Sequence, residues 1–172
     1  MDIAWLWGLA AGALTTILGF LFAVLWDLAK EEKQKRALDD SVMNVLSAGL
    51  ATVVESVKQN IHITTANIEA LKKGQIQITA LQKLPLEYWM LVVAQPPKKL
   101  VRARLLEVVA DSTYRSHQLN CMVKARELFR TSSGGLNTYA VYLNSMDEEI
   151  LNKSTVLLRQ TEMLAKEINA CR

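Results

Sequence analysis

The strongest constraint on this chain is an uncharged run of residues near its start. From Ile3 to Trp26 there is no Asp, Glu, Lys, Arg, His, Asn or Gln. As a helix rising about 1.5 Å per residue, the run would be roughly 36 Å long, which is enough to cross a hydrocarbon core with some tilt. A cleaved signal peptide has a basic lead and a shorter apolar stretch. The sequence therefore predicts a transmembrane anchor over residues 1–27.

Residues at the two ends of this run predict its interfaces and its orientation. Tryptophan prefers the headgroup level, and a Trp stands near both ends. Basic side chains follow the run closely, whereas only the terminal amine precedes it, which favours an outside N-terminus and a cytoplasmic C-terminal domain. The predicted location is the cell (inner) membrane, in a single pass. The predicted membrane-interface residues are Trp5, Trp7, Trp26, Lys30, Lys33, Lys35 and Arg36.

Small residues recur every four positions inside the predicted span. Such a spacing forms a groove in which the backbone of another helix can approach closely. The pattern is consistent with self-association or with docking onto a partner's span, and equally with the general abundance of Gly, Ala and Thr in membrane helices. The candidate packing residues are Gly8, Gly12, Ala11, Thr15, Gly19 and Ala23.

The remaining residues, 28–172, read as one helical domain. Only 7 Gly and 3 Pro occur in the whole chain, which favours long helices. Apolar residues at spacings of three and four predict long helices over about 37–73, 98–131 and 136–169, with a short helix over about 86–94 after Pro85. The first is expected to stop at Lys72-Lys73-Gly74, where lysines complement the helix dipole and Gly can adopt a left-handed conformation. We expect an all-α fold, in which the transmembrane helix continues into an antiparallel three- to four-helix bundle.

Particular side chains are expected in the core of that bundle. A heptad-like series in the last helix is typical of a coiled-coil seam and places one set of residues on one face: Leu136, Tyr139, Leu143, Met146, Ile150, Leu157, Leu164 and Ile168. Aromatic side chains bury large areas, so Tyr88 and Trp89 are expected to be core or loop anchors, and Tyr114 is expected in the core.

Two stretches resemble a pattern in uncharacterised single-pass prokaryotic membrane proteins with a cytoplasmic helical domain. The first is Leu84-Pro85-Leu86-Glu87-Tyr88-Trp89, and the second is Tyr114-Arg115-Ser116-His117-Gln118-Leu119-Asn120. The resemblance implies a membrane helix followed by a helical domain with a Trp-bearing loop. It implies no activity.

The sequence contains no catalytic or metal-binding constellation that its spacing supports. His117 and Cys121 are one helical turn apart, but His62 and Cys171 fall at other heights of the expected bundle. The acidic run at Asp147, Glu148 and Glu149 reads as a solvated helix face. We therefore expect no metal, no cofactor and no enzyme.

Basic residues gather near the expected far end of the bundle. Six of them form a candidate docking surface for an acidic partner, although helix-end charges and ordinary solvation explain them as well. The net charge of +3 is too small to indicate a nucleic-acid partner. The six are Lys72, Lys73, Lys98, Lys99, Arg102 and Arg104.

Two functional hypotheses follow from these patterns. The leading one is a non-enzymatic, membrane-anchored helical scaffold or interaction protein that oligomerises or recruits a partner at the membrane. Its expected partners are membrane lipid and either a second copy or another membrane protein. The alternative is a membrane sensor or effector whose spans assemble into a pore.

Overall fold

In the computed structural model the backbone is described for residues 3–75, 79–132 and 136–170, and side chains for 15–75, 79–130 and 140–170. Every regular element in these ranges is an α-helix, as the sequence predicted. The elements are α1 (Ile3–Lys72), α2 (Glu87–Ala94), α3 (Lys98–Arg102), α4 (Leu106–Ser132) and α5 (Leu136–Ala170).

The chain divides into two compact units, Met1–Ser41 and Val42–Arg172, and α1 contributes to both. Unit 1 consists of the first part of α1, in which the described side chains are almost all exposed. By its length and apolar composition, α1 can cross a membrane. On its surface, the rings of Phe22 and Trp26 stack with centroids 6.2 Å apart.

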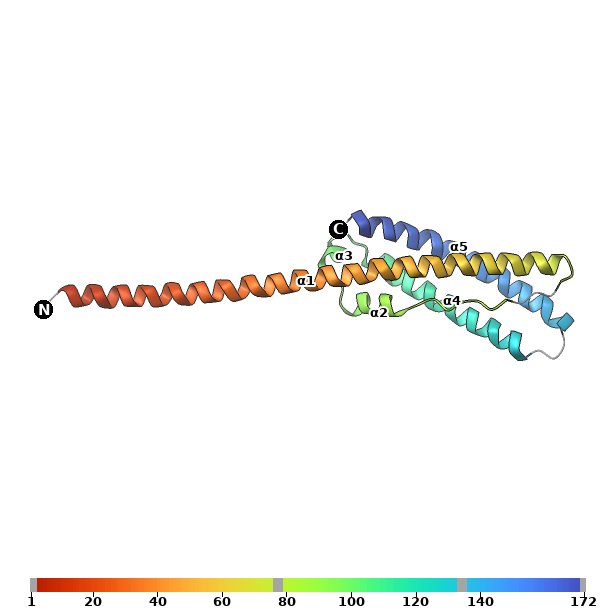
Figure 1. Cartoon of the computed structure of the whole chain (residues 1–172), viewed down its shortest axis with the longest axis horizontal. Helices are drawn as coiled ribbons and strands as arrows, with labels where there is room; N and C mark the ends of the chain where they lie inside the picture. The colour runs from red at the N-terminus through yellow and green to blue at the C-terminus, as the bar shows by residue number, and fades with distance from the viewer. Residues whose placement is uncertain (1–2, 76–78, 133–135, 171–172) are drawn as a thin grey trace. The chain divides into compact units, whose positions relative to one another are not determined.

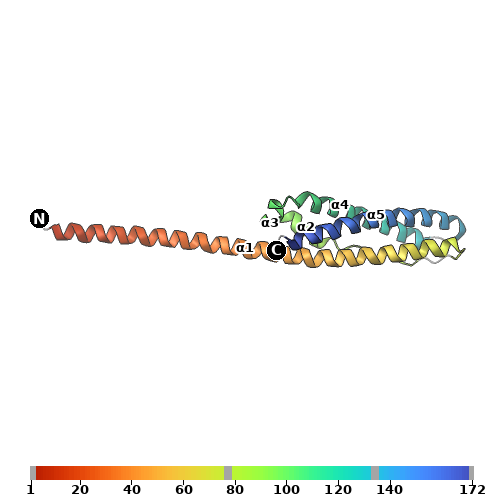
Figure 2. The same ribbon diagram turned by 90° about the horizontal axis from the view of Figure 1, so that it is seen from above.

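Unit 2 is built around one core of apolar side chains. In two perpendicular views, the second part of α1, α4 and α5 lie side by side (Figure 1, Figure 2). Of the expected α5 residues, Leu143, Ile150, Leu157, Leu164 and Ile168 are buried and Met146 is half-buried, while Leu136 and Tyr139 lie outside the described side chains. Trp89 of α2 is buried as well, and Tyr88 is half-buried. They share the core with residues from α1 and α4, among them Leu50 and Leu119. The heptad-like pattern of α5 therefore predicted its buried face correctly.

The end of α1 follows from its sequence. Gly74 has φ 73°, in the left-handed region that glycine adopts without strain. The amide of Gly74 donates to the carbonyl of Leu71 (2.9 Å), and the amide of Gln75 donates to that of Ala70 (2.9 Å). These two bonds form a Schellman motif. It is the helix stop that Lys72-Lys73-Gly74 predicts.

The predicted helix over 98–131 is instead two helices. The short α3 ends in a second Schellman motif, in which Leu105 donates to the carbonyl of Leu100 (3.0 Å) and Arg104 to that of Val101 (3.2 Å). Arg104 occupies the left-handed position with φ 56°, where glycine is usual. Because no Gly or Pro marks this break, periodicity alone could not reveal it.

Candidate functional site

The connection between α1 and α2 is held by side chains rather than by a partner strand. Residues 79–86 carry no helix or strand, and they run back from the end of α1 toward α2 (Figure 1). Asn60 on α1 donates its Nδ2 to the carbonyl of Gln82 (2.8 Å) and accepts from the Gln82 amide at Oδ1 (2.8 Å). The asparagine amide thus replaces the hydrogen bonds that a neighbouring strand would supply.

A second asparagine on another helix repeats this arrangement. Asn120 of α4 accepts from the Leu84 amide at Oδ1 (2.7 Å) and donates its Nδ2 to the Leu84 carbonyl (2.9 Å). Residues 79–86 are therefore fixed between α1 and α4 through backbone atoms. Both partners belong to the stretches that carry the sequence resemblance, and the structure brings those stretches into direct contact.

The most deeply buried charge in the described chain lies beside the start of this connection. The side chain of Arg126 on α4 is 0% exposed, and Asp147 on α5 lies opposite it. The guanidinium donates from Nε to Asp147 Oδ1 and from Nη2 to Asp147 Oδ2 (3.1 Å). Its Nη1 donates to the carbonyl of Thr79 (3.1 Å). One side chain thus joins α4, α5 and the 79–86 connection.

Glu127 extends this network toward the surface. Its Oε1 accepts from Arg126 Nη1 (2.9 Å) and from the amide of Leu81 (3.3 Å), and its Oε2 accepts from Arg130 Nε (2.6 Å). Partial burial by itself raises the pKa of Glu127, but the hydrogen bond from Arg130 and the other donors outweigh it, so that the pKa is lowered overall. The carboxylate is therefore the form that the fold favours.

Acid is expected to weaken unit 2 partly through Glu127. Because its folded pKa lies below its ordinary value of 4.5, the stabilisation is complete above pH 4.5 and is lost as the pH falls through the lower folded value. Urea unfolding of the full chain in mild detergent between pH 6 and pH 3 measures this slope. Glu127→Gln should flatten it. Asp111→Asn is the comparison. Asp111 is more exposed than Glu127, and its pKa is also lowered through its hydrogen bond from Arg115. An unchanged acid slope in Glu127→Gln would refute the assignment.

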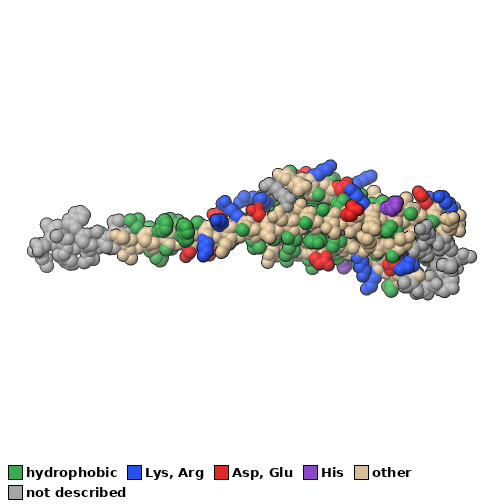
Figure 3. Space-filling view, viewed as in Figure 1, with side chains coloured by type: hydrophobic (Ala, Val, Ile, Leu, Met, Phe, Trp, Pro, Cys, Tyr) green, Lys and Arg blue, Asp and Glu red, His purple; other side chains and the backbone are tan. Residues whose placement is uncertain are grey.

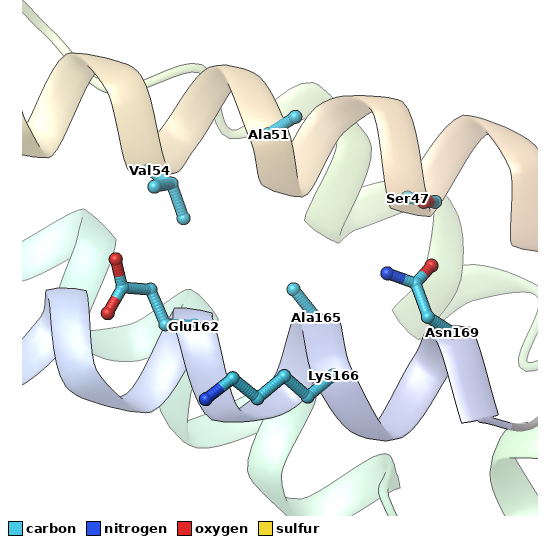
Figure 4. Close-up of a pocket in the computed structure, with 7 residues that line it drawn as sticks. All are labelled: Ser47, Ala51, Val54, Glu162, Ala165, Lys166 and Asn169. Carbon is cyan, nitrogen blue, oxygen red and sulfur yellow. The ribbon is translucent and has the colours of Figure 1, made fainter.

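An open groove lies between α1 and α5 inside unit 2. Its volume is about 490 Å³. Figure 4 shows small side chains on both walls, with the carboxylate of Glu162 directed toward α1. Beyond the groove, the Lys58 ammonium pairs with Glu162 at 3.0 Å and links the two helices. The lining residues are Ser47, Ala51, Val54, Glu162, Ala165, Lys166 and Asn169.

Close packing of α2 on α1 depends on Gly49. A Cβ atom added at Gly49 would overlap Cβ, Cγ and Cδ2 of Tyr88. Although alanine is favoured over glycine in a helix by about 1 kcal/mol, overpacking of this kind costs about 1–3 kcal/mol.

Gly49→Ala is therefore expected to destabilise unit 2 by about 1 kcal/mol net. Urea unfolding of the full chain in detergent measures the change. The exposed neighbour supplies Ala48→Gly, which should lose about 1 kcal/mol through propensity alone. Gly49→Ala in a Tyr88→Gly background, which removes all three overlapping atoms, should no longer destabilise. A stabilising Gly49→Ala in the native background would show that α2 can move away freely.

The structure divides the candidate docking residues into two groups. Lys72 ends α1 and Lys73 follows it. The other four lie on and after α3, at the opposite end of unit 2 (Figure 1): Lys98, Lys99, Arg102 and Arg104. The expectation of one basic surface at the far end of the bundle is wrong. The two groups are separated because residues 79–97 return along the length of unit 2 before α3 begins.

The predicted membrane residues belong to unit 1. Thr15, Gly19, Ala23 and Trp26 are exposed on α1. In the basic flank, Lys35 pairs with Glu31 at 3.4 Å and Arg36 with Glu32 at 2.6 Å, one helical turn apart, while Lys30 and Lys33 are exposed. The predicted residues outside the described side chains are Trp5, Trp7, Gly8, Ala11 and Gly12.

Other predicted residues had mixed outcomes. Asp147 is buried against Arg126, so its assignment to a solvated face was wrong, whereas Glu148 and Glu149 are exposed. Tyr114 is exposed rather than in the core. Within the part of the chain that the structure describes, no group of three His, Cys, Asp or Glu could hold a metal ion.

Comparisons with protein-family models, with curated proteins and with solved structures find no match. The interpretation of the site therefore depends on its own geometry.

Proposed function

We propose that this protein is a non-enzymatic, membrane-anchored helical scaffold whose cytoplasmic bundle oligomerises or recruits a partner protein at the membrane. The span is the first part of α1, in a single pass through the cell (inner) membrane with the N-terminus outside. The apolar run and the basic residues that follow it support this orientation.

The observation that carries the proposal is the groove between α1 and α5. Its walls carry small side chains at Ser47, Ala51 and Ala165, and small side chains allow a third helix or a bulky side chain to approach two helices closely. At its rim, Lys166 and Asn169 are exposed and offer polar contacts around the less polar floor. This combination of an apolar centre and a polar rim is typical of protein interfaces.

Site-directed photocrosslinking in native membranes tests the proposal. A photoreactive amino acid replaces Ala51 inside the groove, and in the matched control it replaces Ala48, which is exposed on the same helix outside it. Crosslinks from position 51 that exceed those from position 48 support the proposal. A dimer-sized product indicates oligomerisation, and a product of another size indicates a partner protein. Equal or absent crosslinking at the two positions would overturn it.

The proposed orientation has a separate test. Cys121 is exposed on α4, so its thiol reports the side of the membrane on which unit 2 lies. In a Cys171→Ser background, a membrane-impermeant maleimide should leave Cys121 unlabelled in intact cells and label it after the membrane is permeabilised. Labelling in intact cells would show that the orientation is inverted.

A further inference from the structure

The short helix α2 has an apolar surface that unit 2 leaves uncovered. Between Tyr88 and Ala94 it contains no charged residue. Trp89 and Val92 turn into the core, but Met90 is 63% exposed and Val93 is 52% exposed. Hydrophobic side chains over α2 are visible at the surface in Figure 3. A helix that is apolar on all sides is ordinarily enclosed by protein or by lipid, so the exposed side needs a partner.

Helix α3 places basic residues beside this surface. Leu100 anchors α3 in the core with 0% exposure, while Val101 on its other side is 51% exposed. Around Val101 the side chains of Lys98, Arg102 and Arg104 are exposed as well. The left-handed conformation at Arg104 turns the chain from α3 into α4 and keeps this basic residue at the end of the unit. Apolar and basic side chains on α2 and α3 together define what we call the α2–α3 surface.

Charge selects the class of partner. Pairing two copies through this surface would bring like charges together, which disfavours a symmetric contact. Exposed Met and Val beside Lys and Arg is the composition of helices that lie in the interface of anionic membranes. Each basic residue close to such a surface adds an attraction worth about a fivefold change in binding.

The covalent connection favours lipid over an acidic protein. The α2–α3 surface lies at the end of unit 2 where α1 enters, because Tyr88 packs against Gly49 and α3 lies beside the first turns of α1 in unit 2 (Figure 1). Only residues 27–41 separate Val42 from the end of the apolar run. These residues are helical within α1 and measure roughly 23 Å, so they keep unit 2 close to the bilayer, and docking requires α1 to bend or tilt between the span and unit 2.

We propose that the α2–α3 surface docks on anionic phospholipid headgroups, with the exposed side of α2 entering the headgroup region. The proposal rests on the membrane anchoring proposed above. It gives unit 2 a second attachment to the bilayer, dependent on lipid charge, besides the span.

Environment-sensitive fluorescence on the full chain tests this docking. The two native cysteines are replaced by serine, Val93→Cys carries the fluorophore, and the labelled protein is reconstituted in vesicles of phosphatidylcholine with or without 30% phosphatidylserine. We expect quenching by brominated lipid only in the anionic vesicles, with its loss at 0.5 M salt. A fluorophore at Val156→Cys, an exposed position on α5, should remain unquenched in both.

A charge-reversal pair separates electrostatic docking from nonspecific contact. Arg102→Glu/Arg104→Glu should lower the ratio of docked to undocked protein at least about tenfold. The matched control is Lys124→Glu/Arg159→Glu, two exposed positions on α4 and α5, which should change it little. Circular dichroism checks that both variants keep their helix content.

Each other outcome has a definite meaning. Equal quenching at positions 93 and 156, or equal quenching in neutral and anionic vesicles, would overturn the docking proposal while leaving the anchoring intact. Fluorescence that depends on the protein-to-lipid ratio and not on lipid charge indicates a second copy, and also overturns it. Failure of the chain to float with vesicles of either kind would instead refute the proposed anchoring.

Discussion

Asp147→Ala is expected to destabilise unit 2 by about 3–5 kcal/mol. The substitution removes the carboxylate on α5 that pairs with Arg126 and leaves a guanidinium with 0% exposure without its main counter-charge. Truncating one member of a buried ion pair usually has this effect, because the remaining charge has lost its solvation and its partner together. Urea unfolding of the full chain in mild detergent, followed by circular dichroism, measures the change.

Two further variants separate the ion pair from simple loss of packing. Glu149→Ala removes an exposed carboxylate two residues further along α5. It should change the free energy of unfolding by less than about 0.5 kcal/mol. Arg126→Met/Asp147→Leu removes both charges and keeps most of the volume, so that it should recover much of the loss. A loss below about 1 kcal/mol for Asp147→Ala would show that water or another group reaches Arg126.

Asn60→Leu is expected to destabilise unit 2 by about 2–4 kcal/mol. Leucine has the same branching and number of side-chain heavy atoms as asparagine but offers no hydrogen bonds, and the amide and carbonyl of Gln82 would both lose their side-chain partner. Each backbone group left unpaired in a partly buried place costs about 1–3 kcal/mol. The same unfolding measurement applies.

Hydrogen exchange locates the effect of this substitution. The amide of Gln82 should exchange much faster in Asn60→Leu, whereas amides within α5 should change only as far as global stability does. The matched control is Gln59→Leu at the exposed neighbouring position, which should leave the Gln82 amide protected. Unchanged protection in Asn60→Leu would contradict the assigned role.

The helices and much of the core could be predicted from the regular spacing of apolar residues. The α5 series from Leu143 to Ile168 predicted its buried face, because a heptad pattern over about seven turns leaves little choice of contact side. The lysines and Gly74 likewise predicted where α1 stops. In contrast, the end of α3 could not be predicted, because Arg104 stands where a glycine would ordinarily signal a helix end. The separation of the basic residues into two groups could not be predicted either, because it depends on the path of a connection that has no regular spacing of apolar residues.

The polar interior could not be read from the sequence. Arg126 and Asp147 are 21 positions apart and each looks like an ordinary charged residue on a helix surface. Asn60 and Asn120 contact atoms that are 22 and 36 positions away. Only the contact of the two resembling stretches offered a signal, since Asn120 closes one of them and Leu84 opens the other. Pairings of this length depend on tertiary packing.

The two asparagines contact only backbone atoms of the connection that they hold. Gln82 and Lys83 therefore keep their side chains exposed, with no part in fixing the conformation that their backbone adopts. Substitutions at these two positions can change what the surface displays while the hydrogen bonds that set its shape remain. In this respect the connection is a graft site: a stretch that tolerates new side chains because its geometry is determined by the neighbouring helices.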